Sequence, residues 1–126
     1  MNLHRLIASL AACASCTWVA ANPALVPIEW NASGHFAHQA EVPAGKFVEV
    51  CGRLPAGTKV QWRFDASGPL NFNIHFHEGE KVRYPAKQDG VARASGTLDA
   101  AASQDYCWMW TNKSQAPADL RLDLGR

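Results

Sequence analysis

The sequence lacks the motifs that mark the common hydrolase active sites. It contains no G-x-S-x-G, the turn that exposes a nucleophilic serine, and no H-E-x-x-H, the helical pair of zinc-binding histidines. Its Asp and Glu residues are scattered over polar positions, so no two carboxylates are set out for glycosidase chemistry. These absences predict that the protein is not an enzyme.

An excess of charge of one sign is also missing. The chain has 12 Lys and Arg residues against 11 Asp and Glu residues, and the two signs are interleaved without a basic run. Proteins that bind a phosphate backbone concentrate basic residues on one surface, so nucleic acid is not expected as a partner. No internal repeat, linker or low-complexity tract divides the chain, which indicates one domain.

The first residues have the features of a targeting segment. A basic start at Arg5 is followed by a largely apolar stretch to about Ala21, small residues occupy 19–21, and Pro23 follows. This order is typical of a secretory signal peptide over residues 1–21, which leaves a single domain over 22–126. The apolar stretch is too short and too polar for a membrane span, and we expect a periplasmic or secreted protein.

Leu10–Cys13 supports an alternative export route. The sequence LAAC also resembles a bacterial lipobox, in which the Cys13 thiol would be acylated and the product would be an outer-membrane lipoprotein. Only about seven apolar residues precede Cys13, which is at the lower limit for such a signal.

The cysteines fit export. Two of the four, Cys13 and Cys16, lie in the targeting segment. The remaining two, Cys51 and Cys107, form an even count in an oxidising compartment, and we expect them to be joined. A loop of this length would stabilise the fold by at most about 4 kcal/mol in the chain-entropy model.

Short segments of alternating apolar and polar residues fill the rest of the chain. Turn sequences separate them, among them ASGP at 66–69 and KQDG at 87–90. Such alternation is typical of antiparallel strands with one dry and one wet face, and no helical period is evident. We therefore predict an all-β, antiparallel two-sheet β-sandwich of about seven to eight strands. The clearest strands are 46–52, 58–65, 70–77, 105–112 and 119–125.

The tryptophans of CWMWTN share one face of their predicted strand. Because this face follows the apolar period, we expect Trp108 and Trp110 to pack in the core. An aromatic platform for a ligand is the alternative.

From Cys51 onward the chain resembles the GOLD (Golgi dynamics) domain, a lumenal β-sandwich of cargo receptors. The resemblance covers about 75 of the 126 residues and is carried by VEVCGRLPAGTKVQWRF, LNFNIHFHEGEKVRYP, GVARASGTL, DYCWMWTN and ADLRLDLG. It implies a disulfide between Cys51 and Cys107. The receptors' membrane span, coiled coil and cytosolic tail have no counterpart here, so cargo sorting does not carry over. With its short signal and possible lipobox, the chain resembles a stand-alone bacterial periplasmic version of that domain.

Histidine supplies the one pattern that suggests a metal. His75 and His77 are two apart on a predicted strand, so they project to the same face about 6.5–7 Å apart at the backbone. Met109 lies on the polar side of its own strand and would add a soft sulfur ligand, which favours copper over zinc. The alternative is that both histidines are solvated residues on the wet face of a strand.

These observations predict an exported, non-catalytic binding module that acts as a monomer without a cofactor. Its contact surface for an unknown protein or small ligand would be the polar face of one strand, formed by Asn73, His75, His77 and Glu78. The rival interpretation is a periplasmic copper-binding or metal-homeostasis protein that uses His75, His77 and Met109.

Overall fold

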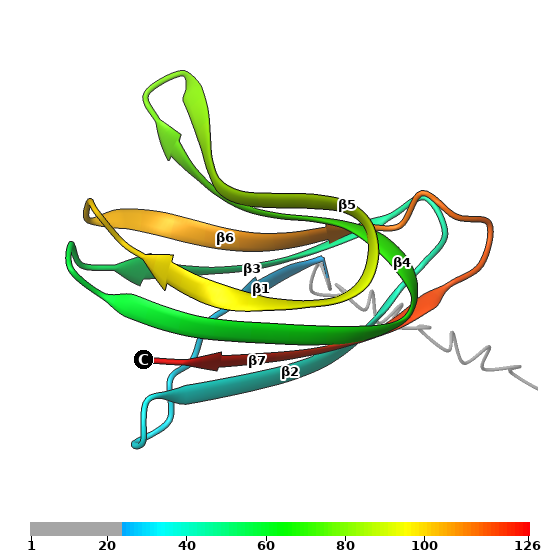
Figure 1. Ribbon diagram of the computed structural model, residues 1–126, viewed down its shortest axis with the longest axis horizontal. Coiled ribbons are helices and arrows are strands. Elements are labelled where there is room, and N and C mark those ends of the chain that lie inside the picture. The colour runs from blue at the N-terminus through cyan, green and yellow to red at the C-terminus, as the bar shows by residue number, and fades with distance from the viewer. Residues whose placement is uncertain (1–23) are drawn as a thin grey trace, which may run out of the picture.

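The computed structural model describes residues 24–126, which form seven strands (Figure 1). The strands are β1 (Leu25–Pro27), β2 (His35–Val42), β3 (Phe47–Leu54), β4 (Lys59–Glu78), β5 (Lys81–Asp99), β6 (Gln104–Thr111) and β7 (Ala118–Gly125). The predicted signal peptide and Cys13 lie outside the described residues. Within residues 24–126, no helix is long and apolar enough to cross a membrane.

All seven strands belong to one sheet, with the order β1-β3-β6-β4-β7-β2 and with β5 along the other side of β4. The first half of β4, 61–66, pairs with β7, and its second half, 71–75, pairs with β6. β4 bends between these two halves, so the sheet curls into a half-barrel (Figure 1). The all-β prediction is confirmed, but the prediction of two separate sheets is wrong, because β4 belongs to both walls.

Two predicted turns are irregularities inside long strands. At ASGP, 66–69, the register between β4 and β5 shifts between Asp65 and Leu70, and the chain continues in the same strand. At KQDG, 87–90, Gly90 has a φ of +68° within β5, and its backbone N–H donates to Oδ1 of Asn71. Gly and Pro mark bulges in strands as well as reversals, so the same residues fit both structures.

One pairing differs in direction from the prediction. β1 runs parallel to β3, with Val26 opposite Val50, whereas all other pairings are antiparallel. The short β1 thus covers the outer edge of β3.

The core fills the inside of the curl. The apolar positions of the alternating segments point inward, and Trp108 and Trp110 are both fully buried, which confirms their expected place in the core. Phe64 lies edge-on to Trp110, with ring centroids 5.6 Å apart. The largest fully buried side chains besides these two tryptophans are Tyr106, Phe64, Phe72, Leu54, Leu70, Ile74, Leu120, Leu122 and Leu124.

Two asparagines hold turns of the same Asn-x-Ser type in different surroundings. The side-chain amide of the fully buried Asn112 donates to the carbonyls of Val42 (3.0 Å) and Ala116 (2.8 Å), and its Oδ1 accepts from the backbone N–H and Oγ–H of Ser114. It ties the loop between β6 and β7 to the end of β2. Asn31 is exposed, and its Oδ1 accepts from both groups of Ser33.

Candidate functional site

The outer face of β3, β6 and β4 carries two adjacent rows of side chains with potential ligand atoms. Each row crosses the three strands at directly paired positions, which places its members side by side on the same face. The rows are Asn73–Met109–Glu49 and His75–Cys107–Cys51.

The disulfide expected between Cys51 and Cys107 is present in the second row. It joins β3 to β6, with Cα atoms 4.1 Å apart. It is therefore an inter-strand bond between neighbours in the sheet, as predicted.

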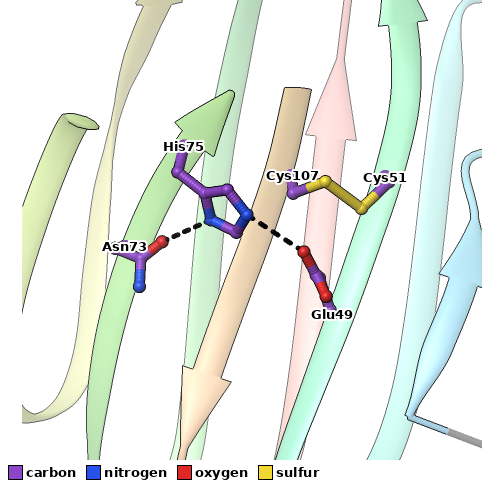
Figure 2. Close-up of a disulfide and its surroundings, with 5 residues drawn as sticks. All are labelled: Glu49, Cys51, Asn73, His75 and Cys107. Carbon is purple, nitrogen blue, oxygen red and sulfur yellow. Dashed lines mark hydrogen bonds and ion pairs between the residues drawn. A yellow bond between two sulfur atoms is a disulfide. The ribbon is translucent and has the colours of Figure 1, made fainter. Parts of the chain in front are cut away.

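His75 lies at the centre of the polar contacts on this face. Its ring lies over β6 and reaches from β4 towards β3 (Figure 2). Nε2 is 3.1 Å from Oε1 of Glu49, and Nδ1 is 2.8 Å from Oδ1 of Asn73. Although it is on the outer face, His75 is only 6% exposed. The His75 side chain is therefore shielded from solvent although it lies on the polar face of its strand, and both of its ring nitrogens have a polar contact.

Burial lowers the pKa of His75, and the positive charge of a protonated His77 lowers it further; Glu49 opposes both by attraction and by its hydrogen bond. The ring is therefore neutral at pH 7 and carries a single N–H. Both ring nitrogens face an acceptor oxygen, Oε1 of Glu49 and Oδ1 of Asn73, so a single N–H donates to one of these oxygens at a time.

The other predicted residues occupy different surroundings. His77 is exposed, with its ring centroid 5.5 Å from that of His75, and Glu78 forms an ion pair with Arg83 at 3.5 Å. Met109 is half-buried directly opposite Asn73. The structure thus brings Asn73, His75 and Met109 to one face and leaves Glu78 at the tip of a hairpin.

This hairpin joins β4 to β5 and stands clear of the other strands (Figure 1). Gly79, with a φ of +62°, and Glu80 form its two-residue turn, between the paired residues Glu78 and Lys81. Val82 lies opposite His77 and therefore shares its face. Tyr84, two residues further on, lies on that face as well, with its ring centroid 6.1 Å from that of His75.

Sequence reasoning missed Glu49, Val82 and Tyr84. Glu49 had a detectable signal, since it occupies a polar position in the alternating segment 46–52. Its contact with His75 requires β6 to lie between β3 and β4, and a single sequence does not reveal that order. Tyr84 follows the alternation of KVRYP, but nothing local shows that it is exposed.

No protein-family model matches the chain, and no curated protein matches it by sequence. Solved structures share its fold. The periplasmic g-type lysozyme inhibitor PliG from Aeromonas hydrophila superposes with a TM-score of 0.53 at 17% identity, covering 79% of this chain and 95% of the inhibitor. PliG from Salmonella Typhimurium gives 0.51 at 11% identity, covering 80% and 96%. The pre-peptidase C-terminal domain of a Bacillus anthracis collagenase gives 0.60 at 10% identity, covering 79% and 93%.

The resemblance to a GOLD domain is therefore wrong. The structural likeness is to the PliG inhibitors and not to a GOLD domain. The misleading pattern was a cysteine on each of two alternating strands, one of them flanked by aromatic residues. Any disulfide between neighbouring strands with aromatic residues on the inner face produces that pattern.

Proposed function

We propose that this protein is an exported, non-catalytic module that binds a protein partner through the hairpin face. This face comprises Asn73, His75, His77, Val82 and Tyr84, on β4 and β5. The fold supports the proposal, because it is shared with periplasmic proteins that are themselves inhibitors of another protein. The lack of hydrolase motifs is consistent with it.

The exposure of Val82 and Tyr84 is the observation that carries the proposal. Tyr84 is 53% exposed and Val82 is 38% exposed, on a hairpin that projects from the sheet. Large side chains left in water on a projecting element are typical of contact surfaces, and tyrosine is enriched among the residues that dominate binding energy. The fixed ring of His75 beside Tyr84 makes the base of this surface rigid, which lowers the entropic cost of binding.

A g-type lysozyme is the first partner to test, because the PliG structures of the same fold are described as inhibitors of that enzyme. We expect the protein to bind a g-type lysozyme in biolayer interferometry and to slow its lysis of a peptidoglycan suspension. Tyr84→Ala should weaken binding at least tenfold, through the loss of about 1.4 kcal/mol or more.

Phe47→Ala is the matched control, because Phe47 is an exposed aromatic residue on β3, 39% exposed and away from the hairpin. It should change the affinity less than threefold. Equal losses for both variants would disprove the hairpin face as the contact surface. Failure of the unmodified protein to bind or inhibit at micromolar concentration would exclude this partner.

The copper-binding alternative, with His75, His77 and Met109, stays a prediction. The position of Met109 opposite Asn73, on the face that carries His75, favours it. The contacts of both His75 ring nitrogens with Asn73 and Glu49 count against it. Titration of the disulfide-bonded protein with copper(I) tests it, and the absence of binding would exclude it.

A further inference from the structure

Three atoms that can bind a metal converge beside the ring of His75. A carboxylate oxygen of Glu49 and the sulfurs of Cys51 and Cys107 all lie within 4.8 Å of one another. Among residues 24–126, no other group of three or more His, Cys, Asp or Glu side chains meets this distance criterion. In the oxidised protein the two sulfurs are bonded to each other (Figure 2), so they cannot act as thiolate ligands.

We propose that reduction of this disulfide creates a zinc(II) site whose protein ligands are Cys51, Cys107 and Glu49. Thiolate sulfur and carboxylate oxygen are both ordinary zinc ligands, and three protein ligands leave the fourth tetrahedral position open for water. The site goes beyond the proposed binding function, because it involves the opposite side of the His75 ring from the hairpin that carries Tyr84 and binds a metal ion rather than a protein.

The sheet keeps these ligands together independently of the disulfide. β3 and β6 pair over eight residues, from Phe47 opposite Thr111 to Leu54 opposite Gln104. β6 is itself held by β4 on its other side, where His75 lies opposite Cys107. The two cysteine backbones therefore remain adjacent when the sulfur–sulfur bond is broken, and only side-chain rotation is needed to admit an ion.

His75 acts as a positioning residue for the carboxylate ligand. Its Nε2 lies 3.1 Å from Oε1 of Glu49, and its Nδ1 is fixed by Asn73 at 2.8 Å. A hydrogen bond of this kind orients a ligating carboxylate, and loss of such a partner commonly lowers metal affinity 10- to 100-fold.

The reductant is a protein dithiol, which reduces the disulfide by thiol–disulfide exchange. One of its thiolates attacks Sγ of Cys51, which is half-buried whereas Cys107 is buried, the sulfur–sulfur bond breaks, and Cys107 leaves as a thiolate. The second thiol of the reductant then displaces Cys51, so the reductant becomes a disulfide and the two cysteines gain two electrons and two protons. Zinc binding releases these two protons to solvent as the thiolates coordinate.

The test uses the full chain with Cys13→Ser and Cys16→Ser, so that Cys51 and Cys107 are its only cysteines. Oxidised and phosphine-reduced samples are titrated with zinc(II) against a chromophoric chelator. We expect one zinc per reduced chain and none per oxidised chain. Cobalt(II) should give the near-ultraviolet thiolate-to-metal band only with the reduced protein.

Single substitutions distinguish the loss of a metal ligand from a general effect on the fold. Glu49→Gln and His75→Ala should each lower zinc affinity 10- to 100-fold in the reduced protein. Glu41→Gln, at an exposed carboxylate on β2, should leave it unchanged. Unchanged affinity in Glu49→Gln would overturn the proposed ligand set.

Two further outcomes decide the role of the cysteines. Equal zinc binding by oxidised and reduced protein would show that the sulfurs are not ligands, and would overturn the proposal. If reduction unfolds the metal-free chain, near-ultraviolet circular dichroism that returns with zinc supports the proposal, and a signal that does not return refutes it.

Discussion

Replacement of Asn112 by alanine should lower the free energy of unfolding far more than the small number of side-chain atoms removed suggests. Asn112 is completely buried, and its amide donates to the carbonyls of Val42 and Ala116. Val42 is also fully buried, so water cannot replace the lost donor at its carbonyl. An unsatisfied buried polar group costs about 1–3 kcal/mol, and each ordinary hydrogen bond lost costs about 1 kcal/mol.

We therefore expect Asn112→Ala to lower the free energy of unfolding by about 3 kcal/mol, a large share of the ~5–15 kcal/mol typical of a domain. Urea denaturation followed by tryptophan fluorescence measures this difference, and the slope of the transition should stay the same.

Asn31→Ala provides the internal comparison. Asn31 makes the same contacts with its own Asn-x-Ser turn as Asn112 does, but it is exposed, so water takes the place of its side chain. The expected loss is about 0.5–1 kcal/mol. If the two variants lost the same free energy, the argument from burial of the Val42 carbonyl would be wrong.

Two further predictions concern packing and protonation. Gly96→Ala should cost about 1–3 kcal/mol, because its Cβ would lie 2.7 Å from Cζ2 of the buried Trp62, whereas Gly68→Ala, with no atom within 4 Å, should stay within about 0.5 kcal/mol in the same denaturation assay. The pKa of His75 is lowered by burial, so the unfolded chain binds its proton first as the pH falls below about 6.5. The stability contributed by the neutral ring is thus present above that pH and lost as the pH falls through the folded-state pKa. His75→Gln should remove this part of the pH dependence of the free energy of unfolding. A variant whose profile between pH 7.5 and 5 matched that of the unmodified protein would contradict this prediction.

The alternation of the sequence was sufficient to predict the class of fold and the content of the core. An alternation of apolar and polar residues with a period of two indicates which side chains face the core, so Trp108 and Trp110 were placed correctly. The same signal does not record where a strand ends. ASGP at 66–69 is a bend within β4, because β7 and β6 pair with its two halves in succession. Those partners are far away in the sequence, the nearest pair being His75 and Cys107, and so lie beyond the reach of local patterns.

The candidate site was predictable only along a single strand. The spacing of Asn73, His75 and His77 correctly put them on one face, since it depends on strand geometry alone. The contact of His75 with Glu49 depends on the order β3-β6-β4, which no local pattern reveals. Met109 was placed correctly on the polar side of its strand, but its position opposite Asn73 also required the register of two strands.

The shared strand β4 has a consequence for how the molecule can come apart. Because one unbroken segment is the neighbour of β7 in its first half and of β6 in its second, loss of β4 removes a pairing partner from both walls of the half-barrel and leaves β2 with β7 and β3 with β6 as isolated strand pairs or edges. We therefore expect that no position within residues 24–126 divides them into two pieces that fold alone. Melting should therefore be a single cooperative event.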